Sequence, residues 1–251
     1  MNALGAAPSV PIRMGWRDVC FGSWSVDPEV VAAHLPESLT VDTYDGDAWL
    51  TVVPYVNVRV RPRGMPEALG VRLPELNLRT YVRSGDAAGV YFFNLDADGA
   101  VSVLGARTTH HLPYYNAEMT VTRRGDRIGF ESERRHPGAR PCRFSATYGP
   151  TGDRLAVEPD TLAHFLTERY RLFTEDQRGR LRYAGVSHEP WQLYEADVTV
   201  DRNDLFVANG FDEPESDPVW YYSPGVETET TESRLVADGT GALAGGPNAP
   251  E

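Results

Sequence analysis

The chain has 251 residues, a formal net charge of -12 and 41% hydrophobic residues, which is enough apolar material for a substantial core. The acidic surplus argues against a surface that binds phosphate backbones, so we predict no nucleic-acid partner. No run approaches the roughly 18 apolar residues that a membrane helix requires, and residues 1–15 lack a basic start followed by an apolar core. We therefore expect a cytoplasmic protein without a membrane partner.

Arginine supplies all 24 basic residues, because the sequence contains no lysine. This composition excludes chemistry that needs a lysine amine within the chain. The bias is typical of a GC-rich genome or of a salt-adapted organism, and the sequence does not decide between them. The two cysteines, Cys20 and Cys142, are too few for a disulfide scaffold, and we expect both to be reduced packing residues.

The first predicted element is a short helix that has Asp27 as its N-cap, proline at its first position and Pro36 as its end. A turn at Asp45-Gly46 then leads into a strand over Ala48–Arg61, which is rich in valine and tyrosine. The segment Arg61–Leu73 holds several prolines and glycines. We expect it to be a loop that crosses over to the next strand, and a lid over a site is the alternative.

The next segment, Leu73–Tyr81, is the predicted centre of the molecule, because its side chains alternate with a period of two. One face carries Glu75, Asn77, Arg79 and Tyr81, and the other carries Leu76, Leu78, Thr80 and Val82. We interpret the polar face as the wall of a binding site. The alternative is a ladder of ion pairs and hydrogen bonds that sets the strand register.

The rest of the chain alternates strands with turns, as in an antiparallel meander. We predict strands over 89–95, 117–123, 127–133, 143–148, 182–187 and 192–201, and an edge strand over 219–222. A short helix capped by Asp98 should carry Arg107 toward residues 110–115. A longer amphipathic helix is predicted over Asp160–Thr174, packed on the outside of the sheet, and a short helical turn near Leu205.

From Ser233 onward the sequence is rich in glycine and alanine and has little to bury. We therefore predict one domain over residues 1–232 and a disordered tail over 233–251. A Gly-x-Gly-x-x-Ala match in this tail lacks the strand and helix that a dinucleotide fingerprint needs.

The usual catalytic motifs are missing. The sequence has no Gly-x-Ser-x-Gly elbow, no phosphate-binding loop and no closely spaced cysteine pair. His110 and His111 are adjacent and point in opposite directions on an extended segment, so we predict no metal site. His188 precedes Pro190 and Trp191, a stiff corner that fits either packing or a catalytic histidine.

Several of these segments occur in an order that resembles the YqjF-like family of uncharacterised proteins. They are Glu75–Val82, Gly89–Phe93, Ala106-Arg107 followed by Leu112-Pro113-Tyr114 and Ala117, Leu166–Tyr170, and His188-x-Pro190-Trp191. The resemblance runs from about Trp16 to Tyr222. It implies a fold similar to that of acetoacetate decarboxylase: a mainly β (α+β) protein whose largely antiparallel strands curve into a cone or barrel around a small-molecule cavity, with a few peripheral helices.

The decarboxylase relatives carry a catalytic lysine shortly after a Gly-x-Pro-like segment, where it forms a Schiff base with a β-keto acid. The similar segment here is His111-Leu112-Pro113-Tyr114, which puts Tyr114 where the resemblance would place that lysine. A phenol with a pKa near 10 cannot form a Schiff base, so the chemistry must differ. The resemblance still implies a cavity, an acid at Glu75 that faces it, and arginines that can hold a carboxylate.

We therefore predict a protein that binds a small carboxylate or carbonyl metabolite inside the cone, without a cofactor or metal. The candidate catalytic residues are Glu75, His188 and Tyr114, and the candidate ligand-binding residues are Asn77, Arg79, Tyr81, Arg107, His111, Tyr115 and Trp191. Turnover stays open. The alternatives are a non-catalytic binding or sensor module, in which Glu75 and Arg79 form a structural pair, and a structural interaction protein with a filled cone. A homo-oligomer is also left open.

Overall fold

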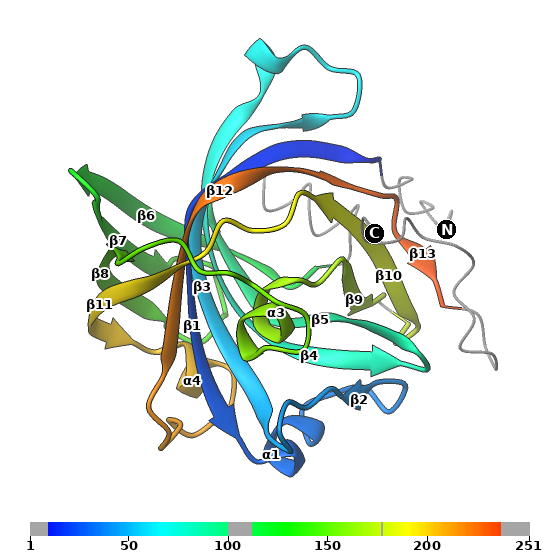
Figure 1. The fold of residues 1–251 in the computed structure, drawn as a ribbon. Coiled ribbons are helices and arrows are strands. Elements are labelled where there is room, and N and C mark those ends of the chain that lie inside the picture. The colour runs from blue at the N-terminus through cyan, green and yellow to red at the C-terminus, as the bar shows by residue number, and fades with distance from the viewer. Residues whose placement is uncertain (1–9, 100–111, 177, 237–251) are drawn as a thin grey trace.

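The computed structural model describes residues 10–99, 112–176 and 178–236. Within these residues, thirteen strands join in one mixed sheet and the helices are short (Figure 1). None of the helices in this part of the chain is long and apolar enough to span a bilayer. The predicted mainly β fold with a few helices is confirmed.

The elements follow one another along the chain with short connections. The strands are β1 (Ile12–Val26), β2 (Thr40–Val41), β3 (Ala48–Pro62), β4 (Val71–Ser84), β5 (Ala87–Asp98), β6 (Tyr114–Arg124), β7 (Arg127–Arg134), β8 (Arg143–Thr151), β9 (Arg171–Glu175), β10 (Leu181–His188), β11 (Tyr194–Asn203), β12 (Val219–Thr230) and β13 (Arg234–Leu235). The helices are α1 (Pro28–Ala32), the 3-10 turn η1 (Glu67–Leu69), α3 (Leu162–Thr167) and α4 (Leu205–Ala208).

Strand pairing within the described residues closes the sheet twice. Nine strands form one ring in the order β5-β6-β7-β8-β11-β12-β1-β3-β4, because β4 pairs again with β5. Seven strands form a second ring in the order β5-β9-β10-β12-β1-β3-β4, closed by the β5–β9 and β10–β12 pairings. The five strands β12, β1, β3, β4 and β5 belong to both rings and form a shared wall. In Figure 1 the strands outside the wall lie to its left for the nine-strand ring and to its right for the seven-strand ring.

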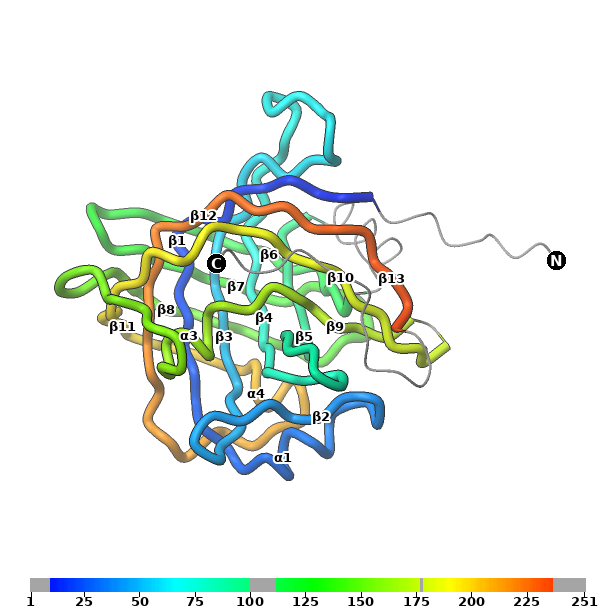
Figure 2. Tube along the Cα trace, turned by 45° about the vertical axis from the view of Figure 1, so that its right-hand side comes forward, coloured from blue at the N-terminus to red at the C-terminus, as the bar shows by residue number. Residues whose placement is uncertain are grey.

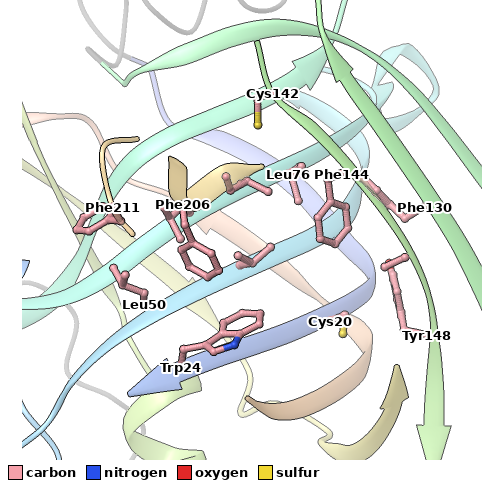
Figure 3. Packing of buried hydrophobic residues seen from close by; sticks show 14 of the residues in the cluster. Cys20, Trp24, Leu50, Leu76, Phe130, Cys142, Phe144, Tyr148, Phe206 and Phe211 are labelled. Carbon is pink, nitrogen blue, oxygen red and sulfur yellow. The ribbon is translucent and has the colours of Figure 1, made fainter. Parts of the chain in front are cut away.

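The core occupies the nine-strand ring. Leu76 and Leu78 of β4 point into it and are fully buried. Large aromatic residues fill the rest of the interior, among them Trp24, Phe130, Phe144, Tyr148, Phe206 and Phe211 (Figure 3). Cys20 and Cys142 belong to the same cluster and are free and buried, as predicted. The apolar face of the predicted central strand therefore packs on the core.

Several sequence predictions are confirmed. Asp27 caps α1 by accepting a hydrogen bond from the backbone N–H of Glu29 at 2.8 Å, although the helix ends at Ala32, earlier than expected. The predicted meander corresponds to β6, β7 and β8, and the predicted turn near Leu205 is α4. Two pairings, β5 with β6 and β5 with β9, are parallel, so the barrel is mixed.

The long helix predicted over Asp160–Thr174 is wrong. Helix α3 ends at Thr167, and the residues that follow form strand β9. Leu172 and Phe173 pair in parallel with β5. This tertiary pairing overrides the apolar spacing of three and four that suggested a helix.

The predicted crossover loop over Arg61–Leu73 is in fact a hairpin. Strands β3 and β4 pair directly from Leu50↔Thr80 to Val60↔Val71, and the hairpin tip extends beyond the rings (Figures 1 and 2). A Cβ on Gly70 would meet the backbone of Arg59 at 2.6 Å, so this close approach requires glycine.

Strand β1 was not predicted from the sequence, and β12 is longer than predicted. A bulge interrupts the pairing of β1 with β3 between Arg17 and Gly22, and Asp18 has a φ of 53°, which disturbs the expected alternation. Strand β12, predicted as an edge over 219–222, extends to Thr230 and lies inside the shared wall. Strand β13 adds Arg234–Leu235, which fall in the predicted tail, while residues 237–251 lie outside the described part of the chain.

Candidate functional site

A cavity of about 340 Å³ lies inside the seven-strand ring. Every strand of this ring contributes to its lining, together with the segment after α3 and the corner at Trp191. Most of the lining is apolar. The polar and aromatic groups in it include Trp16, Tyr55, Asn57, Glu75, Arg79, Tyr114, Thr167, Arg169, His188 and Trp191.

Glu75 projects from β4 into this cavity and is only 2% exposed. Its carboxylate accepts hydrogen bonds from the Tyr55 phenol, from Asn57 Nδ2 at 3.1 Å and from the Tyr114 phenol at 3.0 Å. Tyr55 lies directly opposite Glu75 in the β3–β4 register, and Tyr114 begins β6. The hairpin therefore places two of the three donors beside the acid.

The electrostatic state of this cluster follows from its burial. Burial raises the pKa of Glu75 to about 7, while the hydrogen bonds from Tyr55, Tyr114 and Asn57 oppose the shift. Burial and the charge of Glu75 raise the pKa of both phenols well above their ordinary value. The phenols thus stay protonated donors, and the carboxyl can both release and take up a proton near pH 7.

Arg79 lies four residues from Glu75 on the same face of β4 and borders the same cavity. Its Nη2 donates to the carbonyl oxygen of Leu166 at 3.0 Å, and its buried Nε has no hydrogen-bond partner among the described residues. The structural pair with Glu75 that the sequence allowed is not formed, because four extended residues separate the two Cα atoms by roughly 13 Å. Glu75 instead uses the donors described above.

A second arginine lines the cavity near Arg79. Arg169 donates to Asp42 at 2.7 Å and stacks over Phe165 at 4.3 Å. Burial lowers the pKa of Arg169, the charge of Arg79 acts in the same direction, and Asp42 opposes both. No salt bridge of Arg79 is found in the described residues, so this part of the cavity carries more positive than negative charge.

The predicted corner at His188 and Trp191 also borders the cavity. Trp191 stacks on Trp16 with ring centroids 5.7 Å apart, and its indole N–H donates to the carbonyl oxygen of Thr167 at 3.0 Å. His188 packs on Tyr170 at 4.8 Å, with its Nδ1 2.8 Å from the carbonyl oxygen of Glu189. Burial lowers the pKa of His188. The corner is therefore both a packing unit and part of the cavity wall.

Other predicted site residues lie away from this cavity. Tyr81 is fully buried and donates to the carbonyl oxygen of Leu166 at 2.8 Å, because α3 covers its end of β4. Tyr115 has the opposite parity to Tyr114 and packs against the Arg134 guanidinium at 4.2 Å. Asn77 shares the polar face and is buried, but it does not border the cavity. The predicted Arg107 and His111 lie outside the described residues.

The cavity residues that sequence reasoning missed come mainly from β1 and β3. Trp16 lies on β1, a strand that we did not predict. The alternation of the apolar residues Ile12, Met14 and Trp16 is the sequence signal that could have identified it. Tyr55 and Asn57 are two residues apart on the predicted strand over 48–61, so their side chains share one face of it. A direct hairpin pairing of that strand with the central strand would have placed both beside Glu75.

A second pocket of about 590 Å³ adjoins the cavity. It is polar, and Met14 and His188 border both spaces. Its other lining residues include Arg13, Arg61, Glu227 and Glu229. The side chains of Met14 and His188 therefore form part of the partition between the cavity and the polar pocket.

The sequence model of the DUF2071 family, described as an uncharacterized conserved protein, matches residues 13–227. The chain belongs to this family. The uncharacterized protein YqjF of Bacillus subtilis (strain 168) is 42% identical to the chain over 213 residues, which cover 84% of this chain and 87% of YqjF. The resemblance to the YqjF-like family predicted from the sequence is confirmed.

Solved structures show where the fold of this DUF2071 member recurs. The enduracididine biosynthesis enzyme MppR, complexed with pyruvate, superposes with a TM-score of 0.64 at 16% identity and covers 94% of both chains. Acetoacetate decarboxylase from Legionella pneumophila has a TM-score of 0.61 at 14% identity, covering 94% of this chain and 91% of its own. An acetoacetate decarboxylase-like enzyme from Sphingomonas wittichii RW1 has a TM-score of 0.59 at 14% identity, covering 94% of this chain and 96% of its own. The chain therefore has the acetoacetate decarboxylase-like fold.

Proposed function

We propose that this protein binds a small carboxylate that also carries a carbonyl group, and that Glu75 transfers a proton at that ligand. One observation carries the proposal: a carboxyl group with a pKa raised to about 7 lies buried in the wall of a cavity and is held by two phenols. Proton transfer near neutral pH is most efficient when the acid or base has a pKa close to the working pH.

Arg79 is the proposed carboxylate holder. Its guanidinium borders the cavity, keeps a buried N–H without a partner among the described residues and stands beside a second arginine, Arg169. A guanidinium suits this role because its planar donors match the two oxygens of a carboxylate. The structure of MppR with pyruvate supports a small oxo acid as the class of ligand to test first.

The proposed step needs no lysine. Ionised Glu75 takes a proton from the carbon next to the ligand carbonyl; the C–H electron pair forms a carbon–carbon double bond, and the π pair of the carbonyl moves to its oxygen to give an enolate. The phenols of Tyr55 and Tyr114 keep donating to the carboxyl group and hold it in place. Return of the proton to the carbon closes the cycle.

The alternative is a non-catalytic binding or sensor module, and the same cluster supplies its support. Both oxygens of Glu75 already accept hydrogen bonds, three in all. A buried carboxylate that is satisfied in this way can serve only to hold the wall together. In that case the cavity would bind a ligand that leaves unchanged.

Proton exchange separates the two functions. The protein is incubated in D₂O with a panel of methyl-ketone acids from pyruvate to 7-oxooctanoate, and NMR follows deuterium incorporation next to the ketone. We expect at least one acid to exchange, and Glu75→Gln to slow that exchange by about 100-fold or more. Glu131→Gln, an exposed acid on β7, is the matched control and should exchange like the wild type. Binding without exchange would establish the alternative, and no binding by any acid would refute the proposal.

A further inference from the structure

We propose that the ligand of the seven-strand ring is an elongated amphipathic acid: a carboxylate held at Arg79, a carbonyl group at Glu75, and an apolar body between them. This inference rests on the proposed function and narrows its substrate class. It predicts that the carbonyl and the carboxylate of the preferred ligand are separated by several carbon atoms.

The first argument is the distance between the two polar groups. The β3–β4 register runs without a break from Thr51↔Arg79 to Tyr55↔Glu75, so β4 is regular over this stretch. Four residues of such a strand span roughly 13 Å at about 3.3 Å each. The Arg79 guanidinium donates to the carbonyl oxygen of Leu166, which Tyr81 also contacts, and its Cζ lies 5.8 Å from the centre of the Tyr81 ring, on the side away from Glu75. A three-carbon acid held at one group therefore does not contact the other.

The second argument is the surface between them. On β5, Phe92 pairs with Arg79, Leu95 with Asn77 and Ala97 with Glu75, and all three β5 residues border the cavity. An apolar strip therefore runs alongside β4 from one polar group to the other. A volume of about 340 Å³ lies within the ~300–1,000 Å³ of pockets that enclose drug-sized ligands. An apolar ligand body would remove this strip from water, which is favourable.

The third argument is the distribution of unpaired polar atoms. Three cavity residues carry a buried polar atom without a partner among the described residues: Arg79 Nε, Trp16 Nε1 and Asn57 Oδ1. Asn57 contacts Glu75, and Trp16 pairs with Asn57 across the β1–β3 register. Unpaired groups of the cavity lining thus occur at both polar ends, while the unpaired Oδ1 of Asn77, midway between them on β4, does not border the cavity. Buried polar groups normally have partners, so a ligand that is polar at both ends accounts for them.

A homologous series tests the inference. Calorimetry measures the binding of methyl-ketone acids in which the carbonyl moves away from the carboxylate one methylene at a time, from pyruvate and acetoacetate to 7-oxooctanoate. We expect affinity to rise about fourfold per methylene, which corresponds to about 0.8 kcal/mol for each buried group. Octanoate, which lacks the carbonyl, should bind more weakly than 7-oxooctanoate.

A variant that fills the cavity sharpens the test. Ala184 on β10 is buried and borders the cavity, so Ala184→Leu should move the best acid to a shorter one. Thr199→Leu, at an exposed position on β11, should leave the series unchanged. If Ala184→Leu fails to fold, the wild-type series still decides.

The possible failures are distinguishable. If pyruvate or acetoacetate binds best and exchanges its proton through Glu75, the elongated ligand is refuted and the proposed function stands. If affinity does not change along the series, the elongated ligand is likewise refuted. If no member of the series binds, the proposed function itself falls.

Discussion

The two rings of this barrel share five strands, yet among the described residues only the nine-strand ring is filled. In the nine-strand ring the inward residues of β7 and β8, such as Phe130 and Phe144, are large and apolar. In the seven-strand ring the corresponding residues of β10 are Ala184 and Val186, which leave space. Because side chains of a strand alternate between two faces, the shared wall can support a core on one side and a cavity on the other.

The two rings also differ in how their buried charged side chains are paired. In the nine-strand ring Asp96 and Arg134 form a bidentate pair, with distances of 2.8 and 3.0 Å, and both side chains are almost fully buried. In the seven-strand ring Arg79 has no salt bridge among the described residues, and the donors to Glu75 are uncharged. The filled ring neutralises this pair internally, whereas in the seven-strand ring Glu75 and Arg79 have no charged partner among the described residues and can meet a ligand.

The largest expected contrast follows from these charges. Arg134→Ala should cost about 3–5 kcal/mol of unfolding free energy, because it leaves Asp96 buried and unpaired. Arg79→Ala should cost less, about 2 kcal/mol, because it removes one hydrogen bond and the long cation–π contacts with Phe21 and Tyr81 but orphans no acid. The same variant should weaken the binding of the best methyl-ketone acid at least tenfold. Urea denaturation and calorimetry measure these quantities, and equal losses of stability would show that the two rings do not differ in this way.

A matched pair of phenylalanines probes packing. Phe130 is fully buried in the nine-strand ring, so Phe130→Ala should cost about 3–5 kcal/mol. Phe92 borders the cavity of the seven-strand ring and already lacks neighbours on one side. We therefore expect Phe92→Ala to cost less than about 2 kcal/mol. Similar losses in chemical denaturation would mean that the cavity is packed as tightly as the core.

The pH dependence of stability tests the state of Glu75. Its pKa of about 7 in the folded protein lies above its ordinary value of 4.5, so ionisation opposes folding. Stability from this group is lost as the pH rises from 4.5 through 7, by about 3 kcal/mol at about 1.4 kcal/mol per pKa unit. Relative to the wild type, Glu75→Gln should thus gain up to about 3 kcal/mol between pH 5 and pH 8. Glu131→Gln serves as the control, and a pH-independent difference for Glu75→Gln would contradict the raised pKa.

For the last prediction, borohydride trapping of a Schiff base, we expect no effect. The sequence has no lysine, so treatment with acetoacetate and borohydride should leave the mass of the polypeptide unchanged. Intact-mass spectrometry makes this measurement. A covalent adduct within the chain would contradict the proposal that proton transfer here proceeds without a Schiff base.

The sequence by itself determined what depends on local pattern and composition. The alternation in Leu73–Tyr81 predicted that Glu75 and Arg79 share a face while Leu76 and Leu78 share the opposite one, and the structure places the first two residues on the cavity and the other two in the core. The absence of lysine excluded a Schiff base on a lysine side chain. The ordered motifs indicated the family and with it the fold.

Only the tertiary structure decided which distant segments meet. The apolar spacing of the residues from Arg171 onward predicts a helix. They form strand β9 instead because they pair with β5. Glu75 is held by Tyr55, Asn57 and Tyr114, which are 18 to 39 residues away along the chain. Periodicity reports which side chains share a face, but the partner across a face depends on strand order and register. Those are set by the closure of the two rings, which no local stretch of sequence encodes.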